Sequence, residues 1–131
     1  MSIRVLIAED ADAYRDTLVA LLDLEDDFEV VAALSSGERI VSTALEHRPD
    51  VALLDIDLPG VDGLTASAEL ARRLPDCQVL ILTGLTFNDG FRRAQAVGAS
   101  GFLFKDGSAD GLIDAVRRVA RGERVFDARS H

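Results

Sequence analysis

Several short apolar runs in this sequence end abruptly in a side chain that carries a charge or a hydroxyl group. These side chains are Glu9 and Asp10, Asp55 and Asp57, Thr83, and Lys105. Short apolar runs are typical of buried strands in a parallel sheet. The carboxyl ends of parallel strands share one edge, where ligands of open α/β sheets bind. We therefore expect these side chains to meet at that edge.

The types of these side chains indicate phosphoryl chemistry at a metal ion. Crowded carboxylates repel one another, and a bound cation relieves that repulsion. Oxygen ligands of this kind suit Mg²⁺ (or Mn²⁺). A carboxylate such as Asp55 can act as a nucleophile and form an acyl phosphate. The Lys105 ammonium and the Thr83 hydroxyl, together with the cation, can hold the oxygens of the transferring group.

Five strands, each followed by a helix, are needed to position these residues. The apolar runs predict strands at 3–8, 28–33, 51–55, 79–82 and 100–104. Helical periodicity predicts helices at 13–24, from Ser35 to Pro49, from Asp62 to Pro75, at 88–97, and from Ser108 to Gly122. This alternation predicts an α/β fold, a flavodoxin-like (βα)5 doubly wound parallel sheet with strand order 2-1-3-4-5.

The helix boundaries carry recognisable capping residues. Asp12, Asp62 and Ser108 are predicted N-caps, and Ser35 with Glu38 has the spacing of a capping box. Gly98 is a predicted C′ residue. The helix at 88–97 has few apolar anchors, which is typical of a mobile element.

Length and composition indicate one domain of 131 residues with a net charge of −9. Residues 1–123 form the predicted domain, and 124–131, without periodicity, form the start of a linker or a C-terminal tail. The negative charge argues against binding of nucleic acid by this chain itself. There is no apolar stretch long enough for a membrane span, no visible signal peptide, and a single cysteine, Cys77. We therefore expect a cytoplasmic protein.

Four segments together resemble the receiver domain of two-component response regulators over residues 3–122. They are Glu9-Asp10, Leu54-Asp55-Ile56-Asp57-Leu58-Pro59-Gly60-Val61-Asp62-Gly63, Leu82-Thr83-Gly84, and Gly98-Ala99-Ser100-Gly101-Phe102-Leu103-Phe104-Lys105. The segments Lys105-Asp106-Gly107-Ser108 and Arg121-Gly122-Glu123 are similar to the NarL/FixJ-type branch.

The resemblance implies a role for each site residue. Asp55 would accept a phosphoryl group from a sensor histidine kinase. Asp10, Asp55 and the backbone carbonyl of Asp57 would bind Mg²⁺, and Glu9 would act through water. Thr83 and Lys105 would contact the phosphoryl group. Phe102 would swing inward as Thr83 moves. The chain as a whole would be a phosphoacceptor with at most self-phosphorylation and self-dephosphorylation activity, and not an enzyme.

The resemblance also implies partners. Phosphorylation would change the surface of the fourth helix, the fifth strand and the last helix. It would favour a homodimer through the first and last helices. DNA would be bound only through a C-terminal helix-turn-helix domain that this chain lacks, so we expect a piece of a longer regulator rather than a stand-alone receiver. Leu85 cannot orient an attacking water by hydrogen bonding, and we expect it to slow loss of the phosphate.

Three other functions are consistent with parts of the sequence. Asp55-x-Asp57 also resembles the nucleophile motif of Mg²⁺-dependent haloacid-dehalogenase-like phosphatases, although that family carries its motif on the first strand. A flavin-binding module of the flavodoxin kind would need a phosphate loop where Glu9-Asp10-Ala11-Asp12 stands. The third alternative is a receiver-like interaction domain that works without phosphorylation.

Overall fold

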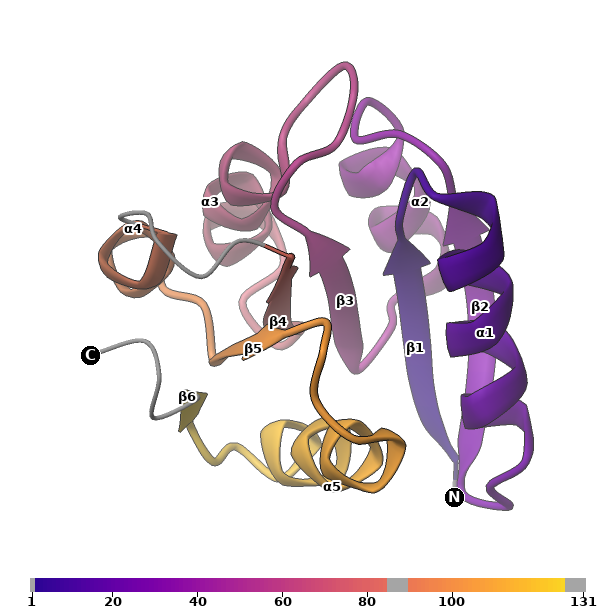
Figure 1. The fold of residues 1–131 in the computed structure, drawn as a ribbon. Helices are drawn as coiled ribbons and strands as arrows, with labels where there is room; N and C mark the ends of the chain where they lie inside the picture. The colour runs from indigo at the N-terminus through magenta and orange to yellow at the C-terminus, as the bar shows by residue number, and fades with distance from the viewer. Residues whose placement is uncertain (1, 85–89, 127–131) are drawn as a thin grey trace.

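The computed structural model describes residues 2–84 and 90–126, which form a parallel sheet covered by helices on both faces (Figure 1). The strands are β1 (Ile3–Ala8), β2 (Phe28–Leu34), β3 (Val51–Asp55), β4 (Gln78–Thr83), β5 (Gly101–Phe104) and β6 (Val125–Phe126). Their order is β2-β1-β3-β4-β5-β6, and all neighbouring strands are parallel. The predicted order 2-1-3-4-5 is confirmed, with β6 added outside β5.

Two apolar clusters separate the sheet from its helices. The helices are α1 (Asp12–Asp23), α2 (Ile40–His47), α3 (Gly63–Arg73), α4 (Gly90–Ala96) and α5 (Ala109–Ala120). Helices α1 and α5 cover one face of the sheet, and helices α2, α3 and α4 cover the other (Figure 1). Successive strand residues alternate between these faces. Leu53 therefore belongs to the apolar cluster under α1 and α5, and Leu54 to the cluster under α2, α3 and α4. Every residue of β3 is consequently buried.

Two of the predicted N-caps are confirmed and one is wrong. Asp62 Oδ1 accepts a hydrogen bond from the Thr65 N–H (2.8 Å), and Ser108 Oγ accepts one from the Gly111 N–H (3.0 Å). The N-cap of α1 is Ala11, and Asp12 is the first helical residue. The Asp12 carboxylate pairs with Arg15 at 2.6 Å and caps no backbone group.

The predicted capping box at Ser35 and Glu38 is also wrong. Helix α2 begins at Ile40, and its N-cap, Arg39, makes no side-chain capping bond. The Gly37 N–H instead donates to the Pro59 carbonyl (3.0 Å), which ties this segment to the loop after β3. A tertiary contact therefore overrides the local signal. The predicted end of this helix before Pro49 is confirmed, because Arg48 is its left-handed C-cap.

Strand β6 lies where the sequence predicted no element. The Val125 N–H donates to the Ser100 carbonyl (2.9 Å), and Val125 and Phe126 pair with Gly101 and Phe102. A Cβ on Gly101 would lie 2.8 Å from the Val125 carbonyl oxygen, so glycine permits this close approach. Two residues are too few to show a period, so this strand has no recognisable pattern in the sequence.

The helix predicted at 88–97 is observed as α4, and residues 88 and 89 lie outside the described residues. Gly98 follows α4 with φ of +84°, as the C′ prediction required. Across 2–84 and 90–126, none of the helices combines the length and the apolar character that a membrane span requires.

Candidate functional site

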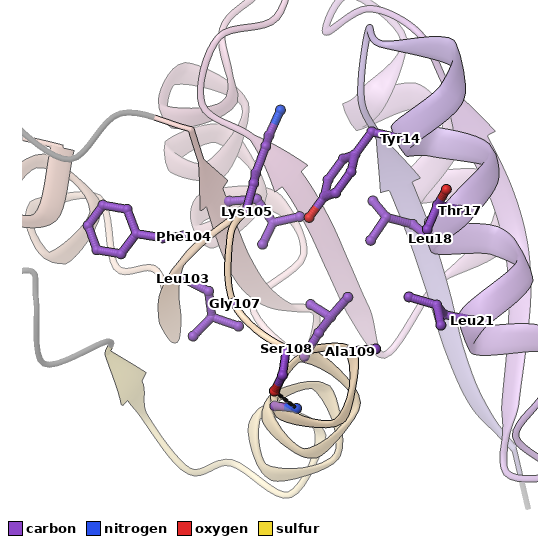
Figure 2. A pocket seen from close by; sticks show the side chains of 13 residues that line it. Tyr14, Thr17, Leu18, Leu21, Leu103, Phe104, Lys105, Gly107, Ser108 and Ala109 are labelled. Carbon is purple, nitrogen blue, oxygen red and sulfur yellow. Dashed lines mark hydrogen bonds between the residues drawn. The ribbon is translucent and has the colours of Figure 1, made fainter.

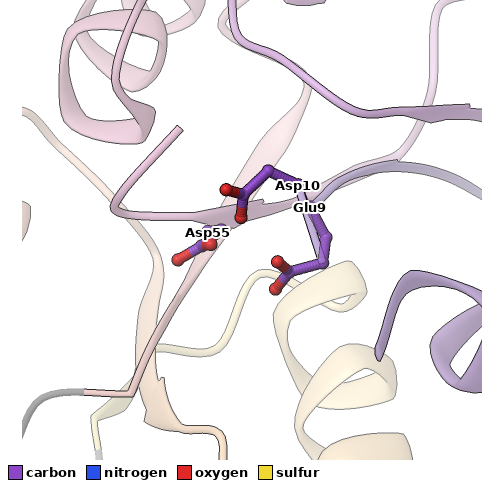
Figure 3. A group of neighbouring side chains, drawn as sticks. All are labelled: Glu9, Asp10 and Asp55. Carbon is purple, nitrogen blue, oxygen red and sulfur yellow. The ribbon is translucent and has the colours of Figure 1, made fainter. Parts of the chain in front are cut away.

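Strands β1 and β3 end side by side and bring three carboxylates together (Figure 3). Ala8 pairs with Leu54, so Glu9 and Asp10 follow β1 at the level where Asp55 ends β3. Carboxylate oxygens of Glu9, Asp10 and Asp55 all lie within 4.8 Å of one another. Glu9 and Asp55 are 0% and 3% exposed, whereas Asp10 is exposed. The cluster is therefore buried on one side and open to solvent on the other.

Strands β4 and β5 add a hydroxyl and an ammonium group. The Lys105 N–H donates to the Thr83 carbonyl (2.8 Å), which continues the pairing of these strands. Lys105 Nζ lies 2.6 Å from Glu9 Oε1 and donates a hydrogen bond to Asp55 Oδ2 (3.1 Å). Thr83 is completely buried at the end of β4. The Lys105 ammonium group thus contacts two of the three carboxylates of the cluster.

Asp57 and Phe102 take positions of a different kind. Asp57 is exposed, and its backbone N–H donates to Asp55 Oδ1 (3.2 Å), so it helps to orient the Asp55 carboxylate. Phe102 is 1% exposed inside β5, where its ring packs on Phe91 and Phe104. Leu85, for which the sequence predicted slow phosphate loss, lies outside the described residues.

Three supporting residues were not recognised as part of the site from the sequence. The Gly63 N–H donates to the Ile56 carbonyl (3.2 Å), and a Cβ on Gly63 would lie 2.1 Å from the Asp55 carbonyl oxygen. The Arg15 side chain donates to the Glu9 carbonyl (2.8 Å). Tyr14 places its ring centroid 5.1 Å from Lys105 Nζ. Arg15 and Tyr14 are placed by tertiary contacts that leave no local pattern in the sequence, whereas Gly63 ends the segment 54–63 that carries the family resemblance.

Burial and charge set the electrostatics of the cluster. Burial raises the pKa of Asp55 to about 6, and the Glu9 charge adds to this effect. The hydrogen bonds from the Asp57 N–H and from Lys105 oppose it. Burial lowers the pKa of Lys105, but hydrogen bonds to Glu9 and Asp55 and the charges of both acids outweigh this effect, so its pKa is raised. Lys105 therefore stays cationic at neutral pH.

The cluster has the donor set of a site for a hard divalent cation. Glu9, Asp10 and Asp55 supply three carboxylates within reach of one ion, and one side of the cluster is open for waters or phosphate oxygens. Mg²⁺ takes few protein carboxylates and keeps such outer ligands. The residues present thus fit Mg²⁺ or Mn²⁺ chemically.

Lys105, which contacts the cluster, also lines two cavities. One, of about 320 Å³, is lined by Tyr14, Thr83, Gly84, Phe104, Lys105 and Asp106. The other, of about 410 Å³, lies between α1 and the start of α5, and Figure 2 shows its lining side chains. Tyr14 and Lys105 line both cavities. The smaller one places free space beside Thr83 and Lys105.

Known proteins share this sequence and fold. The response regulator receiver domain matches residues 5–117. The chain is 40% identical to the uncharacterised transcriptional regulatory protein YvfU of Bacillus subtilis. The alignment covers 95% of this chain and 62% of YvfU. It is 38% identical to the transcriptional regulatory protein DesR of the same organism, over 95% of this chain and 61% of DesR. The chain thus spans about three fifths of the length of these two relatives.

A solved structure agrees with these sequence comparisons. The receiver domain of the response regulator NarL from Mycobacterium tuberculosis superposes with a TM-score of 0.89 at 30% identity, over 93% of this chain and 98% of that one. The family match over residues 5–117 excludes the phosphatase and flavodoxin alternatives as the family of this chain. The chain belongs to the response regulator receiver domain family, and its relatives are response regulators of the NarL/LuxR type.

Proposed function

We propose that Asp55 is the phosphoacceptor of this receiver domain and takes its phosphoryl group from the phosphohistidine of a sensor histidine kinase. The observation that carries this proposal is the contact of Lys105 Nζ with Asp55 Oδ2 at 3.1 Å inside a cluster of three carboxylates. An oxygen of Asp55 forms a bond to phosphorus while the P–N bond of the phosphohistidine breaks. The products are an acyl phosphate on Asp55 and a histidine on the kinase.

Several residues of the chain stabilise the transferring group in this proposal. Lys105 donates to one phosphoryl oxygen, and the Thr83 hydroxyl donates to another. Glu9, Asp10, Asp55 and the backbone carbonyl of Asp57 hold the cation, with Glu9 acting through water. Mg²⁺ supplies positive charge that offsets the charge on the phosphoryl oxygens. The Asp57 N–H supports this arrangement by fixing one Asp55 oxygen, which leaves the other for the phosphoryl group.

The same proposal includes a switch and a dimer. Phe102 connects the site to α4, because its ring packs on Phe91 with centroids 6.2 Å apart. We infer that phosphorylation alters the α4–β5–α5 surface through Thr83 and Phe102, and favours a homodimer through α1 and α5. Sedimentation with and without beryllofluoride measures this association. A monomer in both states contradicts the dimer and leaves the phosphoacceptor role untouched.

We further infer that this receiver domain, which includes strand β6, controls transcription from the cytoplasm through a DNA-binding domain attached after it. Two relatives carry the words transcriptional regulatory protein in their names, and both are longer than this chain. The net charge of −9 supports DNA contact through another domain, because DNA binding needs clustered positive charge.

Phosphorylation with acetyl phosphate and Mg²⁺, followed by intact mass, tests the central claim. The wild-type chain should gain the mass of one phosphoryl group, and Asp55→Ala should gain none. Asp16→Ala is a matched control, because Asp16 is an exposed acid on α1 that lies outside the cluster. A wild-type chain without any gain would support the phosphorylation-independent alternative. Steady turnover of an aryl phosphate would instead support phosphatase activity.

A further inference from the structure

Tyr14 of α1 lies against the lysine of the proposed site. Lys105 Nζ is 5.1 Å from the centroid of the Tyr14 ring, and Figure 2 shows both side chains on the wall of one cavity. A lysine ammonium within about 6 Å of the face of an aromatic ring is attracted by the ring quadrupole. Lys105 is therefore held by Glu9, Asp55 and one aromatic face.

The Tyr14 ring is more rigid than the Lys105 side chain, whose ammonium group lies over it. Tyr14 is partly buried and packs against the apolar cluster under α1 and α5, together with Leu18. Lys105 has four rotatable carbons, and its head group is free to adopt many positions unless contacts restrict it. Contact with the ring limits these positions to the region beside Asp55.

The contact between Tyr14 and Lys105 matters more when Glu9 and Asp55 bind a divalent cation. Glu9 and Asp55 hold Lys105 now, and both belong to the set that fits a divalent cation. Carboxylates that share their charge with a cation attract the ammonium less strongly. The neutral Tyr14 ring is not a ligand that Mg²⁺ prefers, so its attraction for Lys105 remains.

We propose that Tyr14 is a positioning residue that keeps the Lys105 ammonium beside Asp55 during phosphoryl transfer. This inference rests on the proposed phosphoacceptor role of Asp55. Tyr14 itself forms and breaks no bond. Its ring face does the positioning, and the hydroxyl group is dispensable.

Two substitutions of Tyr14 separate the effect of the aromatic ring on Lys105 from the effects of the hydroxyl group and of apolar packing. Tyr14→Phe keeps the aromatic face, and Tyr14→Leu keeps an apolar side chain without it. With acetyl phosphate and Mg²⁺, we expect Tyr14→Leu to gain phosphate about 2- to 30-fold more slowly than wild type, and Tyr14→Phe to restore most of the rate. Leu21→Ala is the control, because Leu21 lines the same cavity from the same helix.

A second measurement needs neither phosphate nor Mg²⁺. In urea unfolding with a chelator present, Tyr14→Leu should lower the midpoint more in the wild-type background than in a Lys105→Met background. Equal losses in both backgrounds would mean that Tyr14 only packs against the core. Tyr14→Met serves as a second ring-free variant if Tyr14→Leu does not fold.

The outcomes distinguish this inference from the function on which it rests. A wild-type chain that gains no phosphate overturns the proposed phosphoacceptor role. A wild-type chain that gains phosphate, with equal rates for Tyr14→Leu and Tyr14→Phe, overturns the positioning role alone. A loss of rate in Leu21→Ala as large as that in Tyr14→Leu also overturns it, because shape of the cavity would then be the cause.

Discussion

Phe126 of β6 packs edge-to-face on Phe91 of α4, with ring centroids 5.2 Å apart and ring planes at 75°. Phe91 in turn packs on Phe102, so the last strand is joined through two rings to the buried residue proposed as the switch. Strand β6 therefore packs against the helix that the proposed switch would move. This contact makes the C-terminal strand part of the folded unit.

Substitution of Phe126 by alanine should destabilise the domain by about 1–2 kcal/mol. An edge-to-face pair contributes about 0.5–1.5 kcal/mol beyond the apolar area that it buries, and Phe126 is only partly buried. Urea unfolding measures the loss. Phe126→Leu should recover the part due to apolar burial, and a Phe126→Ala chain as stable as wild type would show that β6 is not held by this packing.

Substitution of Gly63 by alanine should disturb both stability and the site. Its Cβ would lie 2.1 Å from the Asp55 carbonyl oxygen, so either α3 or the end of β3 must shift. Overpacking of this kind costs about 1–3 kcal/mol. We expect a lower urea midpoint together with slower phosphate gain from acetyl phosphate. Gly107→Ala is the comparison, because its Cβ would meet the Phe104 carbonyl oxygen at 3.4 Å, and it should lose less stability.

The contribution of Asp55 to the stability of chelator-treated protein should fall as pH rises from about 4 to 6. Burial raises the pKa of Asp55 to about 6, so the folded chain binds this proton more tightly than the unfolded chain does. The stability due to the proton is present below the unfolded pKa of about 3.9 and is lost as pH passes the folded value. The expected loss is about 1–3 kcal/mol.

Asp55→Asn isolates this effect, because the amide has no carboxyl proton to bind. Thermal or urea unfolding across the same pH range should show a flatter profile for this variant than for wild type. Equal slopes for the two chains would assign the pH dependence to other groups.

Cys77 should react very slowly in the folded protein. Cys77 is 5% exposed, and burial, aided by the charge of Asp50, raises the pKa of its thiol to about 12. Because only the thiolate reacts, its population at neutral pH is about a thousandfold below that of an ordinary thiol. A colorimetric disulfide reagent at pH 8 measures this rate. Urea-unfolded protein should react at once, and rapid stoichiometric reaction of the folded chain would contradict the burial of Cys77.

The sequence by itself determined five strands of the sheet, their order, and which side chains would lie at the carboxyl ends of these strands. Five apolar runs with helical segments between them admit few right-handed parallel topologies, so the order 2-1-3-4-5 followed without coordinates. Because parallel strands end at one edge, Glu9, Asp55 and Lys105 had to lie near one another. The caps at Asp62 and Ser108 were also readable, since capping is a local interaction.

Only the tertiary structure decided which local signals prevailed and which further residues serve the site. The apparent capping box at Ser35 gave way to the hydrogen bond between Gly37 and Pro59, which are far apart in the sequence. Strand β6 forms because Gly101 leaves room for it, and Tyr14 reaches Lys105 because α1 and the end of β5 meet in space. Contacts between distant segments leave no period or spacing in the sequence, so they appear only when the chain is folded.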